Sequence, residues 1–344
     1  MQRIKLADVA RAAGVHPGTA SRALNPQTRE QVNPATVRRV ARAAQRLGYV
    51  PNPVARGLRT ARSFLIGMVV PDVTNPLFPP MVRGAEKVLT QAGYTLVLTD
   101  TDNDAATERR QIELLRARGT DGFIVATARW KDELLAEIAA AGVPAVLVNR
   151  NTSSAALPYV GGDERTGVRL AVDHLVALRH RRIAHLGGPA NTSTGRERAA
   201  AFRQAVRQHG LPSAGLVRAC AAYTEEAGGD AAARLIDSGQ EFTAVVAGND
   251  LIAFGVLGAL TRAGLSCPGD VSLIGFNDMP HLDKLAPPLT SVALPLAEMG
   301  AQAARILLAR VAGPDSGPPT QSLLGVALKI RASTAEAGTS PPRR

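Results

Sequence analysis

Basic side chains are concentrated at the beginning of this sequence. Residues 1–62 contain 12 of the 40 lysines and arginines but only two of the 29 acids, Asp8 and Glu30. The remaining 282 residues are nearly neutral, with 28 bases and 27 acids. A compact basic segment on an otherwise neutral chain indicates a module that binds a polyanion, attached to a part with a different task.

The residue types that carry out catalysis form no recognisable set. The six histidines are scattered without the spacing of metal ligands, so we expect surface or core roles for His16, His174, His180, His185, His209 and His281. The sequence lacks a nucleophile elbow, a Walker A loop and a dinucleotide fingerprint. Cys220 and Cys267 have no motif spacing and are expected to be reduced thiols. The sequence therefore predicts no enzyme, no metal and no cofactor.

Composition limits the class of protein further. A chain of 344 residues exceeds one ordinary core, and 45% hydrophobic residues are enough to build a small head and a larger body. No apolar run approaches the ~18 residues that a membrane-spanning helix needs. A helical pattern begins directly after the N-terminus without a signal-peptide core, so we expect no export and no membrane.

Within the basic segment, the spacing predicts two short helices joined by a tight turn. Leu6, Val9, Ala10 and Ala13 follow helical periodicity, and Gly14 permits the left-handed turn that ends the first helix. Pro17 suits the first position of a second helix, which directs Thr19, Ser21 and Arg22 outward. This is the spacing of a helix-turn-helix unit, whose second helix enters a DNA major groove.

A third helix and a hinge follow. Asn33 and Pro34 begin the helix and Gly48 ends it, while an apolar stripe is expected at Val37, Val40, Ala41, Ala44 and Leu47. The off-stripe arginines, Arg38, Arg39, Arg42 and Arg46, form a solvated face or contact phosphate. Pro51-Asn52-Pro53 then marks a linker. Residues 54–59 form either a short helix that requires a partner or an ordinary linker, and Leu58 would be exposed between Arg56 and Arg59.

Beyond residue 63, apolar strands alternate with helices at regular spacing. Strands are expected at 64–70, 94–99, 122–126, 144–148, 183–187, 243–247, 271–276 and 323–329, separated by helices. Strands this apolar are covered on both faces, so the sheets are parallel and doubly wound. We expect two α/β lobes with strands crossing between them, and a ligand site beyond the carboxyl ends of the strands.

The run from Leu6 to Asn25, the Leu47-Gly48-Tyr49 helix end and the Pro51–Leu58 hinge resemble the lactose/galactose-repressor (LacI) family of bacterial transcription regulators. The resemblance implies that Arg22 reads a base edge in the major groove. It also implies that Leu58 inserts into the minor groove at the operator centre, with Ala55 and Arg56 beside it. The expected DNA contacts are His16, Thr19, Ser21, Arg22, Ala55, Arg56, Leu58 and Arg59.

Three positions of the head depart from the family pattern. His16 stands where many members have the better capping residues Ser or Thr, and Pro17 and Gly18 stand where members place side chains that touch bases. Neither Pro17 nor Gly18 can donate a side-chain hydrogen bond. We therefore expect fewer direct contacts to bases, made by Arg22, His16 and the hinge.

The resemblance extends over nearly the whole chain. It includes Val70–Phe78, Arg196-Glu197-Arg198, Gly248-Asn249-Asp250, Gly275–Asp278 and Pro287–Thr290, and implies a type I periplasmic-binding-protein-like body that senses an effector. It places effector contacts at Phe78, Arg150, Arg198, Asn249 and Asn277. Asn277 replaces the Asp of many relatives, which favours an effector with its own negative charge, such as a sugar acid or phosphate. Trp130 either lines this cleft or serves packing.

Together these observations predict a homodimeric, effector-responsive repressor that reads a near-palindromic operator in the bacterial cytoplasm, associated with the nucleoid. The predicted division is a helix-turn-helix domain (1–50), a hinge (51–62), an N-lobe (63–162 and 293–322), a C-lobe (163–292 and 323–335) and a disordered tail (336–344). The tail has no leucine heptads, so a coiled-coil tetramer is not expected. Two alternatives are a solute-binding protein for sugar transport and a sugar-modifying enzyme.

Overall fold

The computed structural model describes residues 4–25, 28–49, 62–154, 156–313 and 319–338. The chain divides into two compact units, Met1–Ser63 and Phe64–Arg344, which we call the head and the body. The predicted hinge and most of the predicted tail lie outside the described residues.

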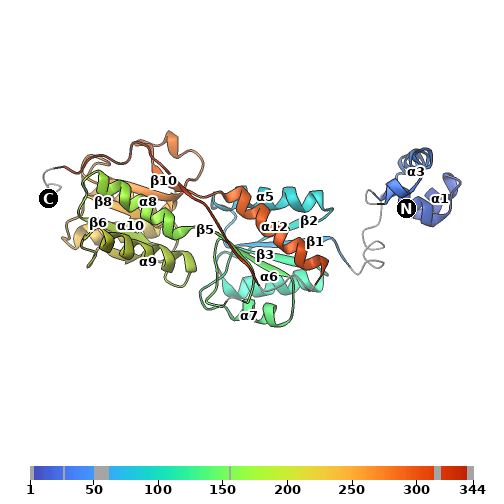
Figure 1. Ribbon diagram of the computed structural model, residues 1–344, viewed down its shortest axis with the longest axis horizontal. Coiled ribbons are helices and arrows are strands. Elements are labelled where there is room, and N and C mark those ends of the chain that lie inside the picture. The colour runs from blue at the N-terminus through green and yellow to red at the C-terminus, as the bar shows by residue number, and fades with distance from the viewer. Residues whose placement is uncertain (1–3, 26–27, 50–61, 155, 314–318, 339–344) are drawn as a thin grey trace. The chain divides into compact units, whose positions relative to one another are not determined.

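The described part of the head is helical, with α1 (Leu6–Ala12), α2 (Pro17–Leu24), the short 3-10 helix η1 (Arg29–Gln31) and α3 (Pro34–Leu47) (Figure 1). The predicted helix ends are confirmed by their backbone chemistry. Gly14 and Gly48 have φ of +60° and +64°, a conformation that side chains with a Cβ disfavour. The Asn33 side chain accepts a hydrogen bond from the Ala35 N–H at 2.9 Å and so caps α3.

Small apolar side chains build the core of the head. Val9 and Ala10 of α1, Ala20 of α2, and Val40 and Ala44 of α3 are all buried there. The predicted stripe on α3 was wrong at one position, because Ala41 is exposed while Ala43 is buried. Helical spacing explains the difference, since positions three and four residues after Val40 share its face.

The body contains two six-stranded sheets, one in each lobe. The N-lobe sheet has the order β11-β5-β4-β3-β1-β2 and the C-lobe sheet the order β12-β10-β9-β8-β6-β7. The N-lobe strands are β1 (Leu65–Val70), β2 (Thr95–Asp100), β3 (Gly122–Val125), β4 (Ala145–Val148), β5 (Tyr159–Gly162) and β11 (Gln321–Leu324). The C-lobe strands are β6 (Ile183–Gly187), β7 (Val217–Ala219), β8 (Ala244–Ala247), β9 (Ser272–Asn277), β10 (Thr290–Ala293) and β12 (Ala327–Lys329). Neighbouring strands pair in parallel except β10 and β12.

Helices cover both faces of each sheet, which confirms the doubly wound α/β class. In the N-lobe, α5 (Phe78–Gln91) and α12 (Leu296–Ala312) lie on one side and α6 (Ala105–Ala117) and α7 (Glu133–Ala140) on the other (Figure 1). The C-lobe helices are α8 (Glu164–Ala177), α9 (Ser193–Gln208), α10 (Glu225–Asp237) and α11 (Asp250–Arg262). Alternate strand residues face opposite layers: Met68 packs in the core with α5 and α12, and Val69 in the core with α6 and α7.

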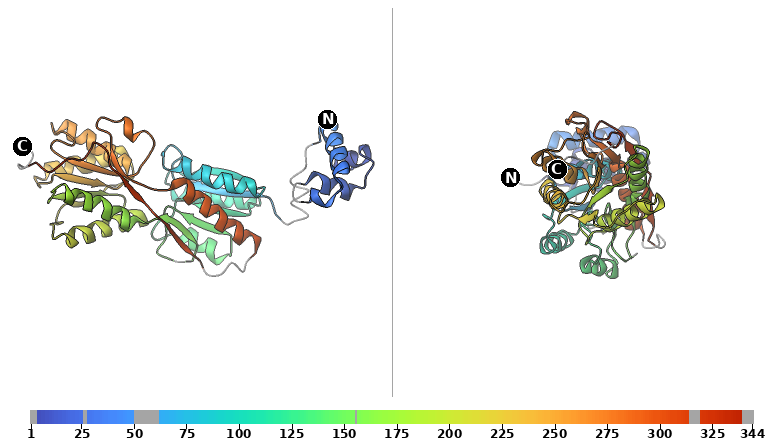
Figure 2. Two further views of the ribbon diagram at one scale, coloured as in Figure 1. Left: turned by 45° about the horizontal axis from the view of Figure 1, so that its top comes forward. Right: turned by 90° about the vertical axis from the view of Figure 1, so that its left-hand side faces the viewer.

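In the described part of the body, the chain passes between the lobes after β5, after β10 and between β11 and β12, the last as an extended red segment in Figure 2. The single strand predicted at 323–329 was wrong, because β11 and β12 belong to different sheets. The last crossing therefore lies between Leu324 and Ala327, just beyond the expected boundary at 322. Sequence reasoning also missed β5, β7 and β10, which are only three or four residues long.

Candidate functional site

The exposed surface of α2 carries the side chains expected to read DNA. Arg22 is exposed, Thr19 and Ser21 are partly exposed, and Arg22 forms no ion pair with any residue that the structure describes. His16 caps the helix, because its Nδ1 accepts the Gly18 N–H at 3.2 Å. That bond leaves Nε2 as the ring nitrogen available to a base edge.

Further positive charge lies on α3. Arg38, Arg42 and Arg46 are exposed and, with Arg39, line a groove of about 390 Å³ beside Ala12. Arg39 has a structural contact in addition, since its Nε donates to the carbonyl of Ala13 at 2.8 Å. Among the described residues of the head, the ion pair joins Arg11 to Asp8, so the four arginines of α3 form no ion pair there. The remaining expected DNA contacts, Ala55, Arg56, Leu58 and Arg59, lie outside the described residues.

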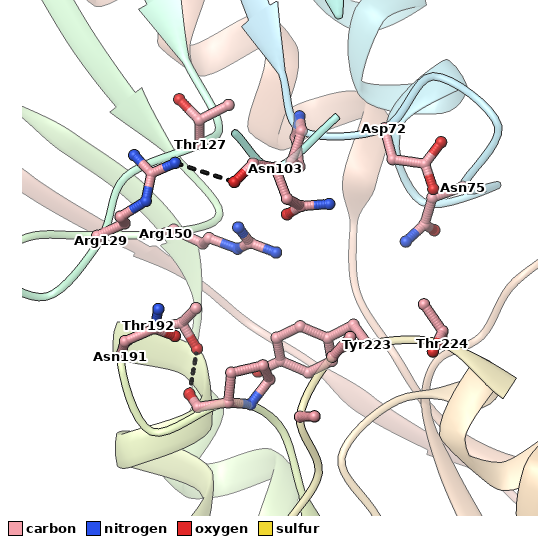
Figure 3. Close-up of a pocket in the computed structure, with 14 residues that line it drawn as sticks. Asp72, Asn75, Asn103, Thr127, Arg129, Arg150, Asn191, Thr192, Tyr223 and Thr224 are labelled. Carbon is pink, nitrogen blue, oxygen red and sulfur yellow. Dashed lines mark hydrogen bonds between the residues drawn. The ribbon is translucent and has the colours of Figure 1, made fainter. Parts of the chain in front are cut away.

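The second site is a cleft at the carboxyl ends of the strands in the body. A cavity of about 270 Å³ lies between the lobes, next to a small one of about 20 Å³. Asn75, Arg150 and Tyr223 line both. Figure 3 shows Asn75 and Asn103 of the N-lobe facing Thr192 and Tyr223 of the C-lobe across the larger cavity. This position agrees with the rule that ligands of open α/β sheets bind beyond the strand ends.

The structure brings together all the residues expected to contact an effector. The small cavity is lined by Phe78, Arg150, Arg198, Asn249 and Asn277, and only Arg150 also lines the larger one. They come from the start of α5, the segment after β4, α9, the cap of α11 and the end of β9.

Two of these residues also have structural roles. Phe78 is 2% exposed and belongs to the core under α5. The Asn249 side-chain oxygen accepts the Ile252 N–H at 2.8 Å and so caps α11. Each therefore presents only part of its side chain to the cavity.

Arg198 is already engaged by the protein. Its Nε and Nη2 donate to the two carboxylate oxygens of Glu164 at 2.5 and 3.0 Å, and its Nη1 donates to the carbonyl of Gly248. Its guanidinium lies 3.7 Å from the centre of the Phe276 ring. Burial by itself would lower the pKa of Arg198, but the Glu164 carboxylate raises it above its ordinary value. The charge of Arg198 is thus neutralised inside the C-lobe.

Arg150 has the opposite environment. It is 9% exposed, and its guanidinium makes no hydrogen bond or ion pair with any residue that the structure describes. The Tyr223 ring lies 5.6 Å from its guanidinium carbon. Burial lowers the pKa of Arg150, yet an arginine remains charged at neutral pH. Of these two arginines, Arg198 is therefore paired with a carboxylate and Arg150 is not.

Asn277 occupies a strained position that buried neighbours hold in place. Its φ is +112° and that of Asp278 is +56°. The carboxylate of Asp250 accepts the Met279 N–H at 2.9 Å and the Ser291 hydroxyl at 2.6 Å, which ties this turn to α11 and β10. Burial raises the pKa of Asp250 to about 7.

Sequence reasoning missed most of the lining of the larger cavity. Tyr223 is the largest of these residues, and its hydroxyl hydrogen-bonds the Thr194 hydroxyl at 2.7 Å. The other polar lining residues are Asp72, Asn75, Asn103, Thr127, Arg129, Asn191, Thr192 and Thr224. A signal was present, because these residues lie within five positions of a strand end: Asn103 comes after β2, Thr127 after β3 and Asn191 after β6. The strand-end rule applied to every strand would have found them.

Trp130 lies at the junction of the lobes rather than in the cavity lining. The guanidinium of Arg196 lies 4.9 Å from the centre of the Trp130 ring, and the backbone N–H of Trp130 donates to the carbonyl of Asn191 at 2.7 Å. A second hydrogen bond between lobes runs from the Asn151 N–H to the Ser193 hydroxyl at 2.8 Å. Trp130 therefore reports on the relation between the lobes.

Two features of the described residues bear on other classes of protein. No group of three or more His, Cys, Asp or Glu side chains in the described ranges could hold a metal ion. No helix among them is long and apolar enough to span a bilayer.

A helix-turn-helix head joined to a two-lobed body with a polar cleft defines a class, the DNA-binding regulators controlled by a small molecule. Residues 5–52 match the model of bacterial regulatory proteins of the lacI family, and residues 172–334 match a periplasmic binding protein-like domain. The HTH-type transcriptional regulator MalR of Streptomyces coelicolor is 35% identical over 342 residues, 97% of each chain. The chain therefore belongs to the lacI family of transcriptional regulators.

Two solved structures extend the match to three dimensions. The transcriptional regulator CelR in complex with cellobiose is 31% identical with a TM-score of 0.73, over 96% of this chain and all of that one. The Lac repressor dimer bound to operator and the anti-inducer ONPF is 26% identical with a TM-score of 0.82, over 97% and 100%.

Proposed function

We propose that this regulator is a homodimeric repressor in the cytoplasm whose affinity for a near-palindromic operator is set by a sugar or sugar acid bound between the lobes. The observation that carries the proposal is the convergence of the expected effector side chains on one cleft in a chain with a basic helix-turn-helix head. The CelR complex with cellobiose supports a sugar-type effector, and the Lac repressor dimer on its operator supports two heads on two half-sites.

In the head, Arg22 carries sequence-specific readout and the arginines of α3 supply general attraction to phosphate. His16, Thr19 and Ser21 assist Arg22, while Ala55, Arg56, Leu58 and Arg59 act in the minor groove. Since Pro17 and Gly18 offer no side-chain donor, discrimination between bases concentrates on the positions that face Arg22 and His16.

In the body, Phe78 provides an apolar platform, and Asn249 and Asn277 hydrogen-bond the hydroxyl groups of the effector. Arg150 and Arg198 bind the effector from opposite lobes, so a bound effector fixes the orientation of one lobe relative to the other. A change in the relative orientation of the lobes alters whether the hinges of the dimer fit the operator. Operator and effector must then change each other's affinity by the same factor.

Operator binding of matched head variants tests the proposal. Arg22→Ala should cost about 1–3 kcal/mol of specific affinity, roughly 5- to 150-fold, and relax the preference at one base pair of each half-site. Arg46→Ala removes the same charge from α3 and should weaken specific and random DNA equally. Log affinity should fall with log salt by about 0.9 for each phosphate contacted. Equal loss of specificity in both variants would contradict the assignment of Arg22.

A base-substitution scan tests the reduced readout separately. Positions that face Pro17 and Gly18 should discriminate weakly between bases. Discrimination there as strong as at the positions facing Arg22 would refute the idea. Effector control is tested by the change in operator affinity when a compound that binds the body is added. If the body binds a sugar but the full chain does not bind DNA, a solute-binding protein is favoured instead.

A further inference from the structure

Two of the three arginines that line the effector cleft, Arg150 and Arg198, have the same side chain but different electrostatic environments. Arg198 is 2% exposed and is held by both oxygens of Glu164. Arg150 is 9% exposed and has no acceptor among the described residues. A buried cation without an ion-pair partner is costly, because it loses hydration that the Tyr223 ring replaces only in part.

The direction of Arg150 identifies where its partner would be. Figure 3 shows the guanidinium extending into the open space between Asn103 and Thr127 on one side and Thr192 and Tyr223 on the other. Its buried Nε and the forked Nη atoms are the donor set that binds two oxygens of a carboxylate or phosphate side by side.

The other charged groups of the lining make their hydrogen bonds and ion pairs with residues other than Arg150. Arg129 adds a second cation, but its Nη1 donates to the fully buried Glu108 at 2.6 Å and its Nη2 to the Asn103 carbonyl at 3.1 Å. Asp72 contributes a carboxylate whose Oδ1 already accepts the N–H and hydroxyl of Thr74 at 2.8 and 2.6 Å. Neither Asp72 nor Glu108 therefore forms an ion pair with Arg150, although the Glu108 carboxylate acts on it from a distance and favours its charged form.

We propose that the effector is an anion of about monosaccharide size, and that its carboxylate or phosphate binds the guanidinium of Arg150. This inference rests on the proposed function and names the chemical class of ligand for the same cleft. The cavity of about 270 Å³ lies just below the roughly 300–1,000 Å³ of drug-sized sites, which favours a small ligand. The side-chain amides of Asn75, Asn103 and Asn191 serve the neutral hydroxyls of that ligand.

Calorimetry with matched compounds tests the charge requirement. The probes are D-glucose, D-gluconate, D-glucuronate and D-glucose 6-phosphate, with the galactose counterparts and inorganic phosphate alone. At least one charged compound should bind the full chain tenfold or more tightly than its neutral parent. Preference for the carboxylates or for the phosphate esters identifies which anion Arg150 receives. A neutral sugar that binds as tightly as its acids overturns the proposal.

The same substitution at both arginines tests the assignment of Arg150, even if no probe binds. Without ligand, Arg150→Met should raise the melting temperature of the body, because it removes an uncompensated buried charge. Arg198→Met should lower it, because Glu164 is left alone. If the melting temperature falls in both variants, Arg150 has a structural role and the proposal is overturned.

The ligand-bound state separates this inference from the proposed function. Arg150→Lys should retain part of the preference for the anion, and Arg150→Met should abolish it. If an anion binds through Arg150 but leaves operator affinity unchanged, the inference stands and effector control fails. If a neutral sugar releases or promotes operator binding, effector control stands and the inference fails.

Discussion

The buried pair between Glu164 and Arg198 allows a quantitative prediction. Both side chains are 3% exposed, and the contact is bidentate at 2.5 and 3.0 Å. Removing one partner of such a pair typically costs about 3–5 kcal/mol, because the other charge stays buried without compensation. Glu164→Gln keeps one acceptor oxygen and the shape of the side chain, so we expect a loss of about 3 kcal/mol.

The assay can isolate the body from the head. Trp130 is the only tryptophan of the chain and lies in the body, so its fluorescence during heating follows the unfolding of that unit. At about 2–4 °C per kcal/mol for a unit of this size, the melting temperature should fall by roughly 6–12 °C.

An exposed pair of the same chemistry supplies the control. Glu298 and Arg305 meet at 2.8 Å in α12 with about half of each side chain exposed. Glu298→Gln should therefore cost less than about 1 kcal/mol, and salt should reduce that cost further. The double variant Glu164→Gln with Arg198→Met should recover stability relative to Glu164→Gln alone, because no buried charge remains. Equal shifts for Glu164→Gln and Glu298→Gln, or no recovery in the double variant, would refute the reasoning.

Other variants test other parts of the body. Burial raises the pKa of Asp250 to about 7, above its ordinary 3.8, so the folded body binds more protons there and should lose stability as pH rises from about 4 to 7. The effect is up to about 4 kcal/mol, and Asp250→Asn should flatten it; an unchanged pH slope would argue against it. Burial lowers the pKa of His185 to about 4, so this residue acts oppositely and costs stability as pH falls from about 6.5 to 4. Chemical unfolding at several pH values should show His185→Phe removing that loss, whatever constant penalty it adds. At Gly300 an added Cβ would lie 1.9 Å from the Met81 carbonyl oxygen, so Gly300→Ala should separate α12 from α5 and cost about 1–3 kcal/mol, whereas Gly313→Ala meets no atom within 4 Å and should be neutral; similar melting temperatures for both would contradict this packing.

The sequence was sufficient for the parts of the fold that depend on local chemistry. Helix ends at Gly14, Asn33 and Gly48 follow from backbone conformation and capping, which involve only neighbouring residues. The long apolar strands and the amphipathic helices were predictable because each has a strong period of its own.

Short strands could not be predicted in the same way. β5, β7 and β10 have three or four residues, too few to establish a period. Their identity as strands depends on neighbours that arrive from elsewhere in the chain, as when Thr290 pairs with Ile274 of β9. The division of residues 321–329 into β11 and β12 is equally non-local, because the two strands differ only in the sheet with which each one pairs.

The same distinction between local and non-local information applies to the effector residues. A resemblance in order and spacing was enough to gather Phe78, Asn249 and Asn277 at one cavity. It could not say whether these residues also serve the fold, because the helix cap by Asn249 and the core packing of Phe78 appear only with the surrounding structure.

The charge of the cleft is the feature that sequence reasoning could least supply. Arg150 and Arg198 are identical as residues, and what distinguishes them is Glu164, which lies 34 residues from Arg198 in the sequence and beside it in space. Asn277 stands in place of an acid and removes one negative charge from the cleft, which is why the sequence favours an anionic ligand. In the structure, Asn277 lines the small cavity with Arg198, which Glu164 neutralises, whereas Arg150 lines both the small and the larger cavity. Under the proposal, an effector that places its anion on Arg150 in the larger cavity has its hydroxyls among Asn75, Asn103 and Asn191, and an orientation that turns the anion away leaves a buried charge without a partner.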